Sequence, residues 1–228
     1  MTRSVDPAAG EPATTCVVAV AAPIGGGKSS LVQGLATALN NAATLHFDDY
    51  ELATRQSPAE LAHWLAQGAD FNSLLAPGFA EAVSALRRGE AVIDPASGQP
   101  IRHGEFVVLE MPLGRAFAET AALIDFLVWV ETPLDLALAR NLRALTVEAL
   151  TNADDPRRFL RWLDDYLGLY MDQVRLILQL QKNRVVPAAD LILDGTQPPA
   201  ALIADAARRI VDSRARARLQ GRAPVDPA

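Results

Sequence analysis

The stretch Ala22–Ser30, APIGGGKSS, has residue types and a spacing that could bind phosphate groups. Successive glycines lack Cβ atoms, so their backbone N–H groups can curl around an anion. A helix beginning at Lys28 would add unpaired N–H groups and the positive end of its dipole. The stretch fits the pattern GxxxxGK[ST] except at its first position, Ala22. It predicts a nucleoside triphosphate site formed by Gly25, Gly26, Gly27, Lys28, Ser29 and Ser30.

Within this loop, Lys28 and Ser29 have separate expected roles. Lys28 would reach the β- and γ-phosphates of the nucleoside triphosphate, and Ser29 would bind Mg²⁺. Of the 21 basic residues, only Lys28 and Lys182 are lysines. A compact ammonium on a flexible stem suits a phosphate loop better than a planar guanidinium does. The lysine therefore favours a phosphate site over the alternative, a glycine-rich turn before an ordinary helix.

Carboxylates follow two other apolar runs, where each predicted strand ends. Asp48 and Asp49 lie in HFDDY, and Glu110 ends FVVLE. The carboxyl ends of parallel strands lie at one edge of a sheet, so these acids are expected beside the phosphate loop. Either Asp48 or Asp49 would accept a hydroxyl proton while the other lies near the metal, and Glu110 would hold Mg²⁺ through water. Helix caps or turn acids are the alternative. His46, which precedes these acids, is interpreted as structural.

Two arginines follow the fourth apolar run, in ETPLDLALARNLRAL. Arg140 and Arg143 are three residues apart and so share a helix face. The pair could close over the phosphates as a lid and stabilise the transferring group. Arg140 is thus a candidate for catalysis, and both arginines are candidates for nucleotide binding. Solvated arginines on an exposed helix are the alternative.

Short apolar runs alternate with helical patterns along the chain. The runs are continuous, as in parallel strands covered on both faces. The expected strands are Cys16–Ala21, Ala43–Phe47, Phe106–Leu109, Phe126–Val130 and Leu191–Leu193. The expected helices are Lys28–Leu39, Pro58–Gln67, Ala80–Arg88, Pro133–Ala144, Pro156–Gln181 and Pro199–Arg214. This order predicts an α/β fold with a doubly wound parallel sheet of five strands.

Length and composition bound the class of protein. The chain has 228 residues and a net charge of −6, which argues against nucleic-acid and membrane partners. Cys16 is the lone cysteine, so no disulfide framework is expected. Without a secretory signal or an apolar run of roughly 20 residues, the protein is expected to be cytoplasmic. A flexible leader (1–14), one domain (15–213) and a flexible tail (214–228) are expected. The oligomeric state stays open, with a homodimer as one option.

The order of these motifs resembles the P-loop kinases that include uridine kinase, nicotinamide riboside kinase and phosphoribulokinase. GGGKSS is similar to the family's loop, HFDDY to its acid-plus-aromatic motif, and VETPLDLALARNLR to its strand and lid helix. The resemblance runs over roughly residues 16–212. It implies the P-loop NTPase fold with a helical lid at about 140–157, and Asp48 as the base. It also implies a hairpin at about 90–104 that flanks the acceptor, and Glu110 as the acid that serves the metal.

The candidate acceptor-binding residues are Asp48, Arg102, His103, Arg115 and Tyr166. Arg102 and His103 lie in the expected hairpin. Arg115 follows LEMPLG at a strand-to-helix turn and could bind an acidic group. Tyr166 shares a helix face with Trp162 and Tyr170; it could stack on a flat ring, with core packing as the alternative.

The expected function is an ATP- and Mg²⁺-dependent kinase that phosphorylates a hydroxyl of a small metabolite, such as a nucleoside, riboside or sugar-like compound. A nucleoside monophosphate kinase is an alternative, with Arg87, Arg88, Arg102 and Arg115 as candidates for gripping the acceptor phosphate. A regulatory ATPase is another. The chain lacks NKxD and LSGGQ motifs and a hydrophobic strand ending in Asp-Glu, which favours a hydroxyl acceptor over water.

Overall fold

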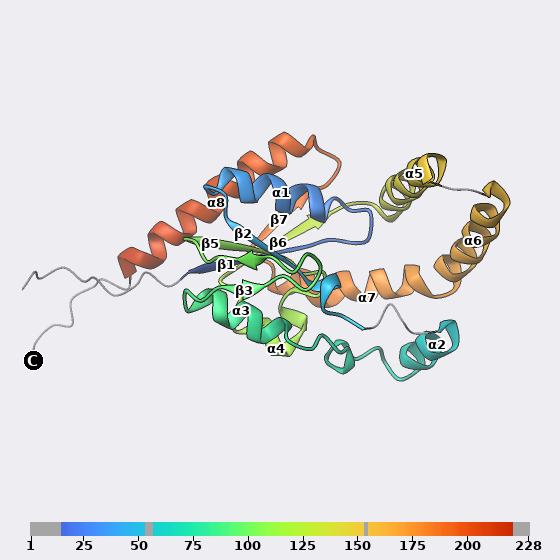
Figure 1. The fold of residues 1–228 in the computed structure, drawn as a ribbon, viewed down its shortest axis with the longest axis horizontal. Coiled ribbons are helices and arrows are strands. Elements are labelled where there is room, and N and C mark those ends of the chain that lie inside the picture. Colours follow the sequence, from blue (N-terminus) through green and yellow to red (C-terminus); the bar gives the residue numbers. More distant parts are fainter. Residues whose placement is uncertain (1–14, 53–56, 153–154, 221–228) are drawn as a thin grey trace, which may run out of the picture.

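The computed structural model describes residues 15–52, 57–152 and 155–220 (Figure 1). Its centre is a five-stranded sheet with the strand order β2-β5-β1-β6-β7. Neighbouring strands pair in parallel throughout. The strands are β1 (Cys16–Ala21), β2 (Ala43–His46), β5 (Phe106–Glu110), β6 (Phe126–Glu131) and β7 (Leu191–Asp194).

Helices cover both faces of this sheet. One face carries α1 (Lys28–Ala38) and α8 (Pro199–Gln220), and the other carries α3 (Phe79–Arg87), α4 (Ala118–Ala121) and α7 (Arg175–Val185) (Figure 1). Successive strand side chains point to opposite faces, so Val17 packs in the core on the α3 side and Val18 in the core on the α1 side. The predicted doubly wound fold is confirmed.

Two smaller elements lie outside the central sheet. α2 (Pro58–Ala66) begins with a capping box, in which Ser57 Oγ accepts from Glu60 N at 3.3 Å and Ser57 N donates to Glu60 Oε2 at 2.7 Å. β3 (Val92–Ile93) and β4 (Pro100–Ile101) pair antiparallel as a hairpin. The hairpin expected within residues 90–104 is therefore present.

A set of long helices projects beyond the carboxyl ends of the strands (Figure 1). It consists of α5 (Leu134–Asn152), α6 (Pro156–Leu169), a π-helical turn (Tyr170–Val174) and α7. The prediction that α5 ends at Ala144 is wrong, because the residues up to Asn152 include neither glycine nor proline. The helix expected to end at Gln181 likewise continues to Val185.

The last helix also runs further than expected. α8 ends at Gln220, so a flexible tail beginning at 214 is wrong over 214–220. The residues after Arg214, ARARL, are good helix formers that the prediction undervalued. Residues 1–14 and 221–228 lie outside the described residues, so the leader and the rest of the tail stay predictions. Of the helices described, none is both long and apolar enough to cross a bilayer.

Cys16 lies at the start of β1 and is 4% exposed. Burial raises the pKa of its thiol to about 11, and the nearby Asp125 carboxylate raises it as well. The thiol is therefore protonated at neutral pH, which makes it a poor nucleophile.

Candidate active site

The loop between β1 and α1 requires glycine at three successive positions. Gly25 and Gly27 have φ angles of +71° and +97°, which other residues rarely adopt. A Cβ on Gly25 would lie 2.1 Å from the carbonyl oxygen of Ala137, and one on Gly26 would lie 2.7 Å from that of Pro23. The loop is therefore held close to α5, and its backbone curvature depends on the missing side chains.

The first turn of α1 leaves its backbone donors available. The helix begins at Lys28 directly after Gly27; in the described chain no side chain caps this turn, and the turn itself contains no acidic residue. Thr132 fixes the loop from the other side by donating its hydroxyl to Gly26 O at 3.0 Å. Free helix N–H groups beside a curved glycine loop form an anion-binding arrangement. This is the geometry predicted for the phosphate loop.

Ser29 and Glu110 lie in contact where α1 begins and β5 ends. Ser29 Oγ donates to Glu110 Oε1 at 3.0 Å, and Glu110 is 7% exposed. The other carboxylate oxygen, Oε2, lies 2.9 Å from Nδ1 of His46. Burial acts to raise the pKa of Glu110, but His46, Lys28 and Ser29 together bring it below its usual value. Glu110 is therefore a carboxylate at neutral pH.

His46 contacts this site through Glu110, which is compatible with its interpretation as structural. Its hydrogen bond to Glu110 raises the pKa of the imidazole. The signal available in the sequence was positional, because His46 and Glu110 are paired residues at the ends of two neighbouring strands. The pairing became visible only once β2 and β5 were known to be adjacent.

The oxygen atoms of Ser29 and Glu110 suit Mg²⁺, which prefers hard oxygen ligands. Among the described residues, no group of three or more His, Cys, Asp or Glu side chains could hold a metal ion alone. An ion here would take its remaining ligands from phosphate oxygens and water, as Mg²⁺ commonly does in nucleotide sites. The residues present fit such an ion.

Asp48 and Asp49 lie in a short 3-10 turn (Phe47–Asp49) directly after β2. Phe47 anchors the turn by packing edge-on against Phe79, with ring centroids 5.3 Å apart. Partial loss of hydration raises the pKa of Asp48; Lys28 opposes this rise and Glu110 adds to it. Burial lowers the pKa of the half-buried Lys28, against the attraction of Glu110 and Asp48. The structure thus brings the predicted base Asp48, the loop lysine Lys28 and the predicted metal-binding carboxylate Glu110 together.

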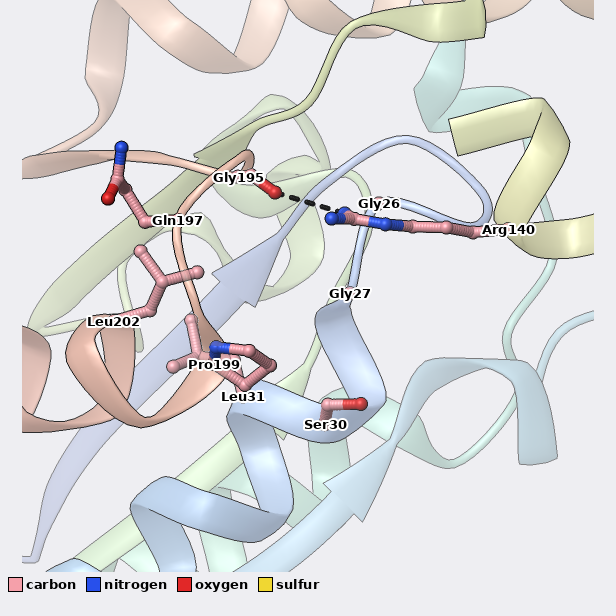
Figure 2. A pocket seen from close by; sticks show the side chains of 9 residues that line it. All are labelled: Gly26, Gly27, Ser30, Leu31, Arg140, Gly195, Gln197, Pro199 and Leu202. Atoms are coloured by element: carbon pink, nitrogen blue, oxygen red, sulfur yellow. Dashed lines mark hydrogen bonds between the residues drawn. The ribbon is translucent and has the colours of Figure 1, made fainter. Parts of the chain in front are cut away.

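Arg140 lines a cavity between the glycine loop and the start of α8 (Figure 2). Its Nη1 donates to Gly195 O at 3.0 Å, in the loop after β7. The cavity is lined by Gly26, Gly27, Ser30, Leu31, Arg140, Gly195, Gln197, Pro199 and Leu202. Apolar walls with a few polar groups are typical of a small-molecule site. Arg140 therefore lies at the cavity beside Gly195, and Arg143 is exposed on α5. Their predicted contact with the phosphates stays a prediction.

Tyr166 approaches the loop through α5. Its hydroxyl accepts a hydrogen bond from Asn141 Nδ2 at 2.9 Å, and the Asn141 Cβ would be 3.0 Å from a Cβ on Gly25. The Tyr166 ring stacks on Trp162, with centroids 5.3 Å apart and planes at 13°. Trp162 is 43% exposed, whereas Tyr170 is buried. The predicted stripe is thus core at one end and open at the other.

Arg115 is correctly placed after β5 but points away from the acceptor side. It donates to Ala188 O at 2.7 Å and to Ile124 O at 3.1 Å, and it pairs with Asp190 at 2.8 Å. These groups surround the amino end of β6, opposite the glycine loop. The prediction that Arg115 binds the acceptor is therefore wrong, because its guanidinium is held at the amino end of β6.

The hairpin presents its tip, not its base, to the site. His103 packs beside Gly89, and the neighbouring Gly104 O accepts from Thr15 Oγ1 at 2.9 Å, just before β1 begins. Arg102 and His103 therefore lie toward the amino ends of the strands, which removes the reason for assigning them to the acceptor. Asp94, at the tip, instead interacts electrostatically with Tyr50 and His46. Sequence reasoning missed Asp94 because the direction of the hairpin was unknown.

Comparison with known proteins gives the fold. No protein-family model matches the chain, and no curated protein matches it. A provisionally named fructose transport system kinase from Silicibacter sp. TM1040 has 20% identity, covers 82% of this chain and 92% of its own, and gives a TM-score of 0.51. The chain therefore has the same α/β fold as that protein. Lower TM-scores come from a provisionally named Bacillus stearothermophilus uridine kinase (13% identity, 82% and 92% coverage, 0.49) and a Sinorhizobium meliloti 1021 gluconokinase (16%, 91% and 98%, 0.48).

Proposed function

We propose that this protein is an ATP- and Mg²⁺-dependent kinase that transfers the γ-phosphate to a hydroxyl of a small metabolite. The observation that carries the proposal is the meeting of Lys28, Asp48 and the Ser29–Glu110 pair around one glycine loop. A phosphate-binding loop alone would fit many nucleotide-binding proteins. A carboxylate beside it with a raised pKa gives the site a proton acceptor.

Each residue has a defined part in this proposal. The loop amides and Lys28 hold the phosphates, and Asp48 orients the acceptor hydroxyl and accepts its proton at a carboxylate oxygen. Ser29 and Glu110 would hold Mg²⁺, with Asp49 nearby; the ion supplies charge neutralisation at the phosphate oxygens. Arg140 would contact the nucleoside part of ATP in the cavity beside Gly195. We also propose that α5 and α6 act as the lid.

The acceptor in this proposal is uncharged, like a nucleoside, riboside or neutral sugar. Three other carboxylates lie close enough to Asp48 to raise its pKa, namely those of Glu110, Glu51 and Asp49. A phosphorylated or carboxylate acceptor would be repelled there unless cations faced it. Lys28 is assigned to the nucleotide, which leaves the acids to receive hydrogen bonds from hydroxyl groups.

Three of the four arginines that could grip a nucleoside monophosphate acceptor form ion pairs away from the glycine loop. Arg87 pairs with Asp125 at 2.9 Å, and Arg115 pairs with Asp190 at 2.8 Å. Arg88 pairs with Glu90 at 2.8 Å on the exposed end of α3. Arg102, the fourth candidate, lies toward the amino ends of the strands, beside His103 and Gly104. These positions weigh against that alternative.

The test is ADP release from purified protein with ATP and Mg²⁺ against a panel of acceptors. The panel contains nucleosides, ribosides and neutral sugars, with gluconate, shikimate and nucleoside monophosphates as anionic counterparts. Lys28→Ala serves as the blank. We expect ADP release only with a neutral hydroxyl compound. Release that is equal with and without any acceptor would support a regulatory ATPase instead.

A further inference from the structure

The side chain of Gln181 joins three segments of the protein. Gln181 lies on α7 and is 5% exposed. Its Nε2 donates to Ala22 O at 3.1 Å and to Pro112 O at 2.8 Å. Ala22 leads into the glycine loop, and Pro112 follows Glu110 by two positions. One amide group therefore contacts the main chain that carries Lys28 and the main chain that carries Glu110.

In the described part of the chain, no backbone N–H makes these two hydrogen bonds. Between β1 and the segment after β5, Met111 N donates to Val20 O at 3.0 Å, and beyond that bond no backbone N–H donates to Ala22 O or to Pro112 O. A buried carbonyl without a donor destabilises the fold, so the side chain of Gln181 supplies the donor for both carbonyls.

Gln181 makes this contact at a cost. Its Oε1 is buried and has no hydrogen-bond partner in the described part of the chain. Turning the amide over would place Oε1 against two carbonyl oxygens, so the contacts themselves define its orientation. A buried acceptor left unpaired costs stability, and such a group in a native protein calls for an explanation beyond packing.

The helix that carries Gln181 also carries the aromatic stripe. α6, the π-helical turn and α7 form one helical run from Pro156 to Val185. Tyr166, on the outer part of this run, is hydrogen-bonded to Asn141 of α5. Gln181 lies on the inner part, against the sheet. The run thus connects the α5–α6 region to the point where the glycine loop and the Glu110 segment diverge.

We infer that Gln181 is a positioning residue that fixes the separation between the phosphate loop and Glu110. It touches neither nucleotide nor acceptor and acts through the two carbonyls that it holds. The inference rests on the proposed function, since the groups it positions are those assigned to the phosphates and to Mg²⁺. Without the clamp, Ser29 and Glu110 would lose their fixed spacing while the loop kept its own curvature.

The experiment compares Gln181→Leu and Gln181→Glu with Gln179→Leu, an exposed residue of the same helix. Gln181→Leu removes both donors and the polar group; Gln181→Glu keeps the length and shape and removes the N–H groups. ATP affinity is measured by calorimetry with Mg²⁺ and with EDTA, thermal unfolding is recorded for each variant, and kcat and KM are measured with an active acceptor.

In both Gln181 variants we expect kcat to fall by about 10–100-fold, as for other residues that orient metal ligands. The factor by which Mg²⁺ increases ATP affinity should fall by about the same amount. ATP affinity in EDTA should change less than about threefold, since the loop and Lys28 remain. Gln179→Leu should behave as the wild type.

A purely structural role gives a different pattern. Gln181 variants that unfold at lower temperature but keep the wild-type Mg²⁺ effect and kcat would overturn the inference. If Gln181→Leu does not fold, Gln181→Glu decides. A wild-type protein without Mg²⁺-sensitive ATP affinity would overturn the proposed function first, and the inference with it.

Discussion

The two edges of the central sheet use charged residues in opposite ways. At the amino edge, Asp125 and Asp190 accept backbone N–H groups of β1 and β6 at 2.8 and 2.7 Å. Each carboxylate is also paired with an arginine, Arg87 or Arg115, at 2.9 and 2.8 Å. The charges of each carboxylate and arginine, and the first N–H groups of the strands, are thus paired within the folded chain.

At the carboxyl edge the charges are less completely matched. Asp48 and Lys28 interact, but the pKa of each is shifted toward its neutral form by loss of hydration. The loop before α1 consists of glycines without side chains, and the first turn of α1 has no side-chain cap among the described residues. The comparison teaches that a charged strand end becomes a candidate site when its groups are left for a ligand to satisfy.

The largest break in this comparison should come from Asp48→Asn. The amide cannot accept the acceptor's proton, so kcat should fall by about 10²–10⁴-fold. ATP affinity should stay within about threefold, since the loop and Lys28 are unchanged. Asp49→Asn is the matched variant: a near-complete loss of kcat there, with Asp48→Asn active, would assign the base to Asp49.

The pH dependence of turnover sharpens the same contrast. Asp48 accepts a proton only as a carboxylate, and loss of hydration raises its pKa above the ordinary 3.8. Turnover should therefore fall about tenfold per pH unit on the acid side, with a midpoint above that of an ordinary aspartate. Lys28 lowers this pKa, so Lys28→Met should raise it further, as measured by NMR titration of the Asp48 carboxyl carbon. A shift in the other direction would contradict the placement of Lys28.

At the amino edge we expect a substitution to lower stability without lowering catalytic activity. Arg115→Ala removes hydrogen bonds to three carbonyls and the partner of Asp190. The free energy of unfolding should fall by about 1.5–3 kcal/mol, as for hydrogen bonds to charged groups. The unfolding temperature would drop by roughly 2–4 °C per kcal/mol. Acceptor KM and kcat of the folded enzyme should not change; a raised acceptor KM would return Arg115 to the acceptor site.

The smallest effect should come from the base of the hairpin. Arg102 and His103 lie toward the amino edge. Arg102→Ala and His103→Ala should therefore each change acceptor KM by less than about twofold, within the range of surface substitutions. Asp94→Asn, at the tip, is the comparison variant and should change acceptor KM more. Steady-state kinetics with one acceptor from the panel measures all three.

The fold and the loop could be predicted because they depend on local patterns and on one topological rule. Continuous apolar runs such as CVVAVA mark covered parallel strands, and the GGGKS spacing marks the loop that follows. Parallel strands end at a common edge, which was sufficient to bring Glu110 beside Ser29 before any contact was known.

Side-chain direction could not be predicted in the same way. Arg115 reaches Asp190, and Gln181 reaches Ala22, through contacts between residues far apart in the sequence. The contact between His46 and Glu110 likewise depends on the pairing of β2 with β5. Helix ends were missed where an exposed helix continued without an apolar stripe, as α5 does beyond Ala144.

The buried thiol of Cys16 makes the chain convenient for spectroscopy. With a pKa of about 11 it should resist maleimide reagents at neutral pH, so a single added cysteine would carry a fluorophore or spin label without background. Leu150, on α5 and 83% exposed, is a suitable attachment point. A label there would report changes in the surroundings and mobility of α5 in solution, with ATP added or withheld, from an otherwise unaltered polypeptide.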